Sequence, residues 1–204
     1  PEKERNQALQ SIDNLEQGRK YAGLITSMYP DTGDLRRELY PKHLEFFKAG
    51  AEYRERCVIA ANRVGKSEGM GGYETALHLT GMYPKWWEGK RFTKPIDAWV
   101  SGKNSETTRD IVQKKLIGGR PDMEEAGTML IPKKCIGDFT LKPNTGGLID
   151  RIKIKHVSGG ESLLGFKSYE PGRSSFEGTE KDLIWFDEEP PQDIYSQCIT
   201  RTLD

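Results

Sequence analysis

The sequence is poor in cysteine, and its few cysteines lie far apart. Three occur in 204 residues, at Cys57, Cys135 and Cys198, and none belongs to a Cys-x-x-Cys pair. An odd number at such spacing indicates neither a disulfide framework nor a zinc site. We therefore expect three buried, unreactive thiols, because free cysteine is among the residue types most often buried.

Long apolar runs and an excess of charge are also missing. No apolar stretch approaches the roughly 20 residues that span a bilayer, and the opening PEKERNQALQ is charged from its second residue, unlike a secretory signal. We therefore expect a cytoplasmic protein without a membrane partner. The 31 basic and 31 acidic residues give a net charge of +0, so any polyanion site must be a local patch. The chain begins at Pro1 and not at methionine, which favours a piece of a longer protein.

Apolar runs with the length of strands recur along the chain. They span residues 57–61, 96–100, 152–157, 163–166 and 182–186. Helical patterns follow the first two runs, KSEGMGGYETALHLTGM and ETTRDIVQKKLIGG. Strands that alternate with helices predict an α/β fold around a parallel sheet, whereas residues 120–160 are more typical of loops and hairpins.

The amino-terminal part differs in pattern from the rest. Its apolar residues Leu9, Ile12 and Leu15 recur at three-residue spacing, which predicts one amphipathic helix. Pro30 and Gly33 then interrupt the pattern. We therefore divide the chain into a helical lead-in, residues 1–34, and a domain over residues 35–204.

The stretch ERCVIAANRVGKSE has the order of a phosphate-binding loop. An apolar run leads into a turn, and Gly65, Lys66 and Ser67 stand before a helical pattern. In such a loop the backbone N–H groups surround a phosphate, the lysine reaches the β- and γ-phosphates of ATP, and the hydroxyl holds Mg²⁺. The residues expected to line the nucleotide are Ala60, Ala61, Asn62, Arg63, Val64, Gly65, Lys66 and Ser67.

Taken alone, the tripeptide Gly-Lys-Ser is weak evidence, because it also arises by chance. Ala60 stands where such loops usually begin with glycine, so the loop must accept a Cβ there. Its position between an apolar run and a helical pattern is what favours a nucleotide site.

A second stretch, KDLIWFDEEPP, is an apolar run that ends in acids. Asp187 would stand at the carboxyl end of a strand, where it can hold the Mg²⁺ carried by Ser67. Glu188 would then position or deprotonate an attacking water. Alone, these acids would be read as a solvated turn; together with the loop they predict an ATP hydrolase that uses ATP and Mg²⁺.

A third stretch, RELYPKHLEFF, enters the helix before the loop. Tyr40 can stack on an adenine base and His43 can bond to its edge. The alternative is a helix that packs on the sheet with Tyr40 as a core residue, and the sequence leaves both possibilities open.

Together these residues resemble the ATPase domain of the large terminase subunit, the motor that packages DNA in tailed bacteriophages. The resemblance is carried by RELYPKHLEFFKAG, ERCVIAANRVGKSE and YEPGRSSFEGTEKDLIWFDEEPPQDIY, from about Leu35 to the end. It implies a P-loop NTPase sheet of the RecA-like (ASCE) type, flanked by helices. It also implies double-stranded DNA, the portal protein and the small terminase subunit as partners, and a homo-oligomeric ring in the host cytoplasm.

The resemblance also implies roles for single residues. Lys66 and Ser67 would be the Walker A pair, Asp187 the Walker B acid and Glu188 the catalytic base. Arg173 would reach the ATP of a neighbouring subunit, where a guanidinium neutralises charge in the transition state.

The sequence departs from the family in three respects. His43 stands where glutamine is common, and the loop arginine, Arg63, lies one place later than in many relatives, so the resemblance does not by itself give Arg63 the role of a finger in its own site. The chain also ends at CITRTLD, before the coupling strand and the nuclease, so no nuclease activity is expected.

Three other functions remain open on the sequence. A RecA-like helicase or remodelling ATPase would use the same fold, a P-loop kinase would need Glu188 little, and a nucleotide-binding module would lack turnover. Candidate DNA contacts are Lys114, Lys115, Arg120, Lys133 and Lys134. Because the net charge is zero, a solvated helix face is the favoured reading of these lysines and arginine.

Overall fold

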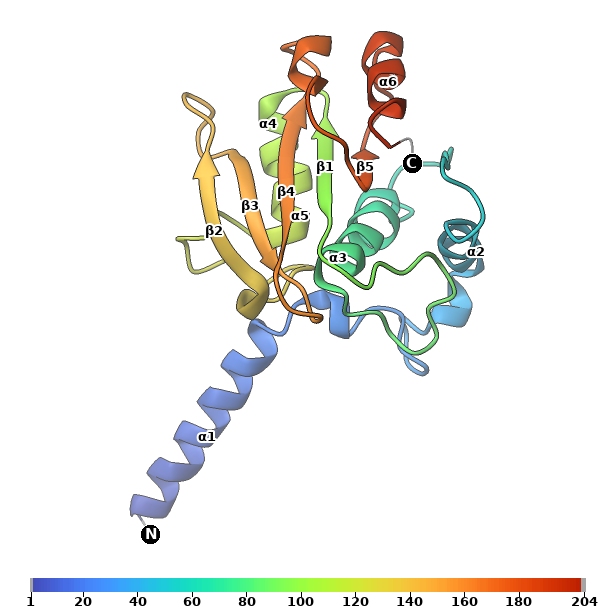
Figure 1. Cartoon of the computed structure of the whole chain (residues 1–204). Coiled ribbons are helices and arrows are strands. Elements are labelled where there is room, and N and C mark those ends of the chain that lie inside the picture. The colour runs from blue at the N-terminus through green and yellow to red at the C-terminus, as the bar shows by residue number, and fades with distance from the viewer. Residues whose placement is uncertain (1, 203–204) are drawn as a thin grey trace.

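The computed structural model describes residues 2–202, which form a mixed α/β domain around one five-stranded sheet (Figure 1). The strand order is β2-β3-β4-β1-β5. The strands are β1 (Asp97–Gly102), β2 (Ile136–Leu141), β3 (Ile149–Lys155), β4 (Glu161–Ser168) and β5 (Leu183–Phe186). Four of the five expected strands are therefore confirmed within a few residues.

The expectation of a parallel sheet is only partly right. β1 pairs in parallel with β4 on one side and β5 on the other. β2, β3 and β4 instead form antiparallel pairs. The reason is the short connections at residues 142–148 and 156–160, because a connection of a few residues joins only antiparallel neighbours.

Helices pack on both faces of the sheet, fully on one face and in part on the other, and α1 points away from the domain. They are α1 (Glu2–Lys20), α2 (Pro41–Ala49), α3 (Tyr73–Thr80), α4 (Ser105–Thr107), α5 (Lys114–Ile117) and α6 (Gln192–Ile199). The connecting helical turns are η1 (Leu24–Thr26), η2 (Arg37–Leu39), η3 (Lys66–Gly72), η4 (Thr108–Gln113), η5 (Lys133–Cys135) and η6 (Arg173–Phe176). Figure 1 shows α4 and α5 behind the sheet, α1 pointing away from the domain, and α6 with η6 beyond the upper ends of the strands.

Local sequence explains several of the helix ends. Pro41 opens α2, where a missing N–H costs nothing, and Gly50 follows its last residue. The Asn104 side chain accepts a hydrogen bond from the Thr107 N–H, and the Thr107 hydroxyl closes a capping box at α4. Gly81, with φ +72°, ends α3 in the left-handed conformation that glycine adopts without strain.

The strand expected at residues 57–61 is wrong. This segment forms no ladder with any strand of the described chain, and Ile59 is 95% exposed. β5 lies at the edge of the sheet and pairs only with β1. Apolar residues alone favoured a strand, but a strand needs a neighbour that accepts its hydrogen bonds.

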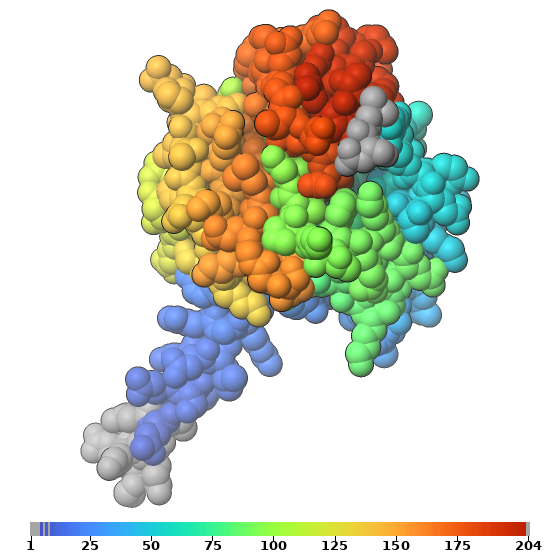
Figure 2. Space-filling model, viewed as in Figure 1, coloured from blue at the N-terminus to red at the C-terminus, as the bar shows by residue number. Residues whose placement is uncertain are grey.

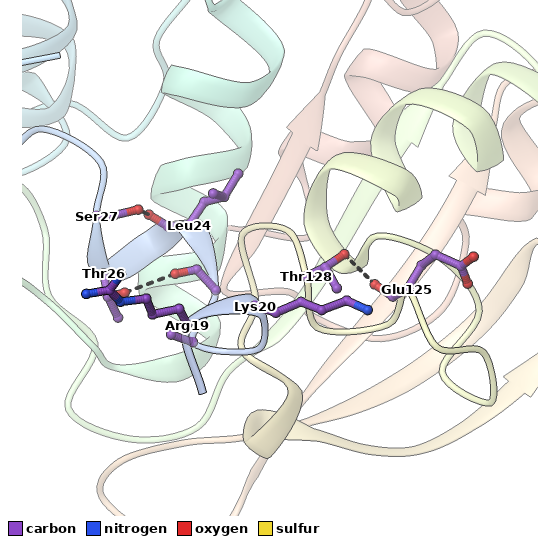
Figure 3. A pocket seen from close by; sticks show the side chains of 9 residues that line it. Arg19, Lys20, Leu24, Thr26, Ser27, Glu125 and Thr128 are labelled. Carbon is purple, nitrogen blue, oxygen red and sulfur yellow. Dashed lines mark hydrogen bonds between the residues drawn. The ribbon is translucent and has the colours of Figure 1, made fainter. Parts of the chain in front are cut away.

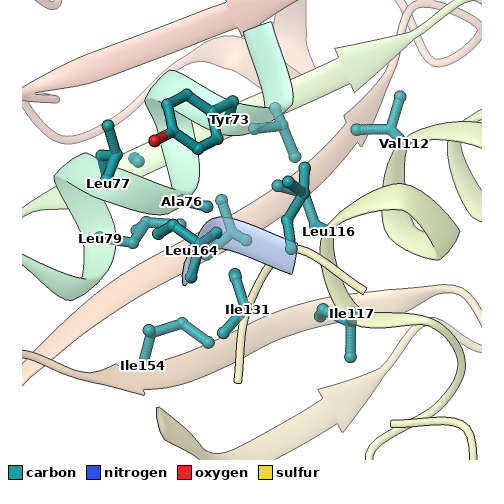
Figure 4. Packing of buried hydrophobic residues seen from close by; sticks show 14 of the residues in the cluster. Tyr73, Ala76, Leu77, Leu79, Val112, Leu116, Ile117, Ile131, Ile154 and Leu164 are labelled. Atoms are coloured by element: carbon teal, nitrogen blue, oxygen red, sulfur yellow. The ribbon is translucent and has the colours of Figure 1, made fainter. Parts of the chain in front are cut away.

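The main core lies between the sheet and the helices behind it. Leu77 and Leu79 of α3 pack with Leu116 of α5 and with Leu164 and Ile154 of the sheet (Figure 4). A smaller cluster on the opposite face joins Trp99, Tyr169, Phe176, Ile194 and Cys198. The sheet is thus covered along its whole length on one face and only over β1 and β5 on the other.

Two expectations from the termini and the cysteines can be compared with this core. Cys135 and Cys198 are buried as expected, whereas Cys57 is exposed, because the segment that holds it does not join the sheet. α1 was expected and is confirmed. Ile25 and Tyr29 of the lead-in belong to the main core, and the division at residue 34 stays a prediction. No helix within residues 2–202 combines the length and apolarity needed to cross a membrane.

Candidate functional site

Residues 60–67 form a loop that leads directly into a helix. η3 has the wider, π-type hydrogen bonding and continues without a break into α3. Gly65 precedes it with φ +83°, and Arg63 also has a positive φ of +64°, which is unusual for a residue with a side chain. The two left-handed residues turn the chain sharply from the exposed segment into the helix.

The loop presents unpaired donors next to a cation. The Lys66 ammonium donates to the carbonyl oxygen of Ala61 at 2.8 Å and to that of Ala60, so it folds back over its own loop. Among the described residues, no acceptor is found for the backbone N–H groups of residues 61–65. Free amides, a lysine and a helix start together form a site suited to a phosphate group.

The carboxyl end of β5 brings the predicted metal residues together. Burial holds the pKa of Asp187 above its usual range, and the nearby Ser67 hydroxyl, Lys115 and Lys66 oppose that rise. Ser67 and Asp187 therefore lie side by side, although Asp187 stands 120 positions after Ser67 in the chain. A carboxylate and a hydroxyl are oxygen ligands of the type that Mg²⁺ prefers, with water and phosphate completing the coordination.

Glycine in η3 makes this approach possible. A Cβ placed on Gly71 would lie 2.4 Å from the indole of Trp185, so any larger residue would push the helix off β5. Trp185 stands two residues before Asp187 on the same strand. Close packing of η3 on β5 therefore sets the separation of Ser67 and Asp187. Neither Gly71 nor Trp185 was predicted from the sequence as a site residue, because their contact joins distant segments.

The other predicted catalytic residues lie on neighbouring elements. Glu188 is exposed, and its backbone carbonyl accepts a hydrogen bond of 2.7 Å from the Tyr169 hydroxyl. Arg173 is exposed on η6, where its Nε donates to Oε1 of Gln197 on α6 at 3.0 Å. Glu188 thus follows Asp187 directly, whereas Arg173 is held by a contact with α6.

His43 lies beneath the loop, buried to 8% exposure. Its Nε2 is 3.1 Å from the carbonyl oxygen of Val64, and its Nδ1 is 2.6 Å from the hydroxyl of Tyr29. The Tyr29 hydroxyl also donates to the carbonyl oxygen of Gly69 in η3 at 2.6 Å. Tyr40 packs its ring 5.3 Å from that of His43. Both ring nitrogens of His43 are therefore occupied by contacts within the protein.

Tyr29 is a site residue that sequence reasoning missed. It stands in SMYPDTGD, which was read only as a break between helices. A tyrosine before proline in a turn carries no signal for a phosphate loop, so only the tertiary contacts identify it.

The lysines and arginine considered for DNA are largely engaged in local contacts. Lys115 pairs with Glu68 at 3.0 Å, Arg120 pairs with Asp122, and the Lys133 ammonium lies 3.4 Å from the carbonyl oxygen of Met123. These contacts agree with the solvated face favoured by the sequence.

A pocket of about 460 Å³ lies elsewhere, between the end of α1 and the loop before Thr128 (Figure 3). Its hydroxyl groups donate to main-chain carbonyls nearby: Thr26 to Gly23, Ser27 to Leu24, and Thr128 to Glu125. The hydroxyl protons of this pocket are therefore already engaged in hydrogen bonds with the backbone. We place the functional site at the loop of residues 60–67 instead.

The fold and the site define a mixed α/β domain with a Gly-Lys-Ser loop at a helix start, next to an acidic strand end. The family model described as terminase large subunit, T4likevirus-type, N-terminal, matches residues 57–203. The chain therefore belongs to the family of terminase large subunit N-terminal domains, as the sequence resemblance indicated. The match begins at Cys57, just before the loop.

A curated relative supports the same family. The chain is 39% identical over 180 residues to the terminase large subunit of Salmonella phage P22. The match covers 80% of this chain but only 36% of that relative, so the chain spans about a third of its length. No solved structure matches.

Proposed function

We propose that this chain is the ATPase part of a phage terminase large subunit and hydrolyses Mg-ATP to drive the packaging of double-stranded DNA. The observation that supports this most is the meeting of Ser67 with Asp187 beside the amine of Lys66. A P-loop NTPase needs this combination of hydroxyl, carboxylate and lysine to hold the metal and the phosphates.

Each residue has a proposed task at this site. Lys66 leaves the carbonyls of Ala60 and Ala61 to contact the β- and γ-phosphates of ATP. Ser67 and Asp187 would hold Mg²⁺, which, when bound, would neutralise charge that develops on the phosphates. Glu188, exposed and next to Asp187, orients the attacking water and accepts its proton.

The adenine base cannot be assigned to His43 directly, because both ring nitrogens of His43 already have contacts within the protein. A contact between His43 and adenine would require His43 to give up Val64 or Tyr29. We therefore propose that His43 supports the loop from below and that Tyr40, which is partly buried beside it, is the residue available to the adenine ring.

The assembly is a further part of the proposal. Because the chain covers 36% of the length of its relative, the portal protein, the small terminase subunit and a homo-oligomeric ring are proposed partners of the longer protein. Arg173 is the proposed finger toward a neighbouring subunit, with Arg63 as the alternative within the same site.

Phosphate release with and without the Glu188 carboxylate tests the proposal. Glu188→Gln should bind ATP normally and lose about 10²- to 10⁴-fold in turnover, the usual effect of removing a general base. Glu189→Gln, one residue further and also exposed, is the matched control and should keep turnover. Equal turnover in wild type and Glu188→Gln would contradict the assignment.

The dependence of turnover on protein concentration distinguishes the two arginines. A rate that rises faster than linearly and is lost in Arg173→Ala supports a site completed by a neighbour. A linear rate that is lost in Arg63→Ala supports a self-contained site.

A further inference from the structure

The uncovered part of the sheet carries basic side chains. From Arg151 to Lys155 the residues of β3 alternate, with Ile152 and Ile154 buried in the main core and Arg151, Lys153 and Lys155 exposed on the opposite face. α6 and η6 cover this second face over β1 and β5 only. Figure 2 shows the uncovered strands β2 to β4 in yellow and orange, beside the red segments of the carboxyl-terminal end.

The register of three strands brings cations together on this face. Thr140 of β2 pairs with Arg151 of β3, which pairs with Gly165 of β4. Lys167 lies two residues beyond Gly165 on β4, so it shares the face of Arg151. Lys142 directly follows β2, past a register shift at Leu141, and its charge lowers the pKa of Lys167, so the two side chains lie near each other. Neighbouring strands lie about 4.8 Å apart, so β2 and β4, one on either side of β3, are separated by roughly 10 Å.

The ring of Trp99 makes cation–π contacts with two lysines. The Lys167 ammonium lies 4.9 Å from the centre of the Trp99 ring, and the Lys181 ammonium lies 4.8 Å from it. The Lys181 ammonium has a counterion, because it donates a hydrogen bond to the Asp97 carboxylate at 2.5 Å and another to the Thr179 hydroxyl. Lys167 has the same aromatic support but no carboxylate.

Lys142 and Lys167 lack a counterion although both are partly buried. Within residues 2–202, neither ammonium has a hydrogen-bond or ion-pair partner. Burial lowers the pKa of both lysines, and the charge of Lys142 lowers that of Lys167 further, while Asp150 offsets only part of the effect. Lys153, by contrast, pairs with Asp138 and Glu161 at 3.4 Å, and Nε of Arg151 lies 3.9 Å from the carboxylate of Asp150. A partly desolvated cation without a partner is costly, and a bound anion removes that cost.

We propose that Lys142, Arg151 and Lys167 form a surface that binds the phosphate backbone of duplex DNA. The three positive groups are spread over an open sheet face, which suits an extended polyanion better than a small phosphate compound that needs an enclosing pocket. Trp99 is 7% exposed and covered by lysines, so it offers no platform for an unpaired base. The surface rests on the proposed packaging function and adds a place for the DNA, on a face distinct from the loop of residues 60–67.

Affinity for a fluorescent duplex, measured without nucleotide between about 50 and 200 mM salt, tests the surface. In Lys142→Gln/Lys167→Gln, the slope of log affinity against log salt should become shallower by about 0.9 for each lysine, because two phosphate contacts are lost. Lys142→Arg/Lys167→Arg keeps the charge and should keep the slope, which separates a charge effect from a packing defect.

Lys114→Gln/Lys134→Gln is the matched control, since it removes the same charge from the solvated face. This control should bind DNA with the wild-type slope. An unchanged slope in Lys142→Gln/Lys167→Gln, a shallower slope in the control, or no duplex binding by the wild-type chain would each overturn the surface. ATP turnover of the wild-type chain without DNA is measured separately, and its absence would count against the ATPase function alone.

Discussion

The hydroxyl of Tyr29 lies 2.6 Å from Nδ1 of His43 and 2.6 Å from the carbonyl oxygen of Gly69. The ring of His43 also contacts the carbonyl oxygen of Val64. Each of these three contacts needs one proton to be a hydrogen bond. Burial lowers the pKa of His43, so the ring is neutral near pH 7 and supplies one proton, and the tyrosine supplies another. The contact with Val64, at 3.1 Å, is the longest of the three. Two protons therefore serve three contacts: when the ring proton is on Nε2, His43 donates to Val64, and the single Tyr29 proton serves either His43 Nδ1 or the carbonyl oxygen of Gly69.

Tyr29→Phe should weaken the support of the loop. Removing a buried hydroxyl that serves two partners should lower the free energy of unfolding by about 1 to 3 kcal/mol. It should also raise KM for ATP more than it lowers kcat, because the loop would be less ordered before binding. Urea unfolding and steady-state kinetics measure the two effects.

Tyr73→Phe is the matched control for Tyr29→Phe. Tyr73 packs 5.0 Å from Tyr29 and is fully buried, but its hydroxyl has no partner among the described residues. Its removal should leave stability unchanged or slightly higher. Equal losses in the two variants would show that packing, and not the hydrogen bonds, is responsible.

Asp187→Asn should stabilise the free protein while it abolishes Mg-ATP binding. Burial raises the pKa of Asp187 above its ordinary value of 3.8, so the folded state binds the proton more tightly than the unfolded chain. The free energy of unfolding therefore falls as the pH rises from 3.8 to the raised pKa of this carboxyl, because the folded protein then loses a proton that it binds more tightly than the unfolded chain does. At pH 7 the variant should melt about 2 to 4 °C higher, the effect of roughly 1 kcal/mol in a chain of this size.

Melting curves against pH test the sign of this effect. The difference between Asp187→Asn and wild type should shrink as pH falls below the raised pKa, where both side chains are neutral. If Asp187→Asn melted at a lower temperature than wild type at pH 7, the conclusion that the charged Asp187 carboxylate destabilises the free protein would be wrong.

Glu74→Gln should destabilise the fold strongly. Glu74 is 4% exposed, and both of its oxygens lie 3.0 Å from the guanidinium of Arg56, just before the exposed segment. Breaking a buried pair leaves an uncompensated charge and should cost about 3 to 5 kcal/mol in urea unfolding. Glu45→Gln breaks the exposed pair with Lys42 and should cost less than about 1 kcal/mol. Similar costs for both would mean that Arg56 finds another partner.

Thiol labelling tests the exposure of the segment before the loop. Cys57 is exposed, whereas burial raises the pKa of Cys135 and raises that of Cys198 to about 12. A thiolate-specific reagent should therefore modify one thiol per native chain and all three after denaturation. Cys57→Ser should abolish the native reaction. Protection of Cys57 in the native chain would instead support the strand first expected at residues 57–61.

Much of the local structure follows from the sequence. Pro41 and Gly50 delimit α2, Gly81 ends α3, and apolar runs of strand length mark β1, β4 and β5, because caps and periodicity act within a few residues. The loop that ends at Ser67 could be recognised for the same reason, since its donors are contiguous in the chain.

Contacts between distant segments were decided only by the tertiary structure. Apolarity cannot name the partner of a strand, so residues 57–61 read as a strand although nothing described pairs with them. Pairing across strands set Arg151 and Lys167 on one face with Lys142 near them, and packing of Gly71 on Trp185 brought Ser67 to Asp187. The sequence by itself thus determined which chemical groups are present and where several helices begin and end, because these features depend on neighbouring residues. Long-range packing determined which of these groups lie next to one another.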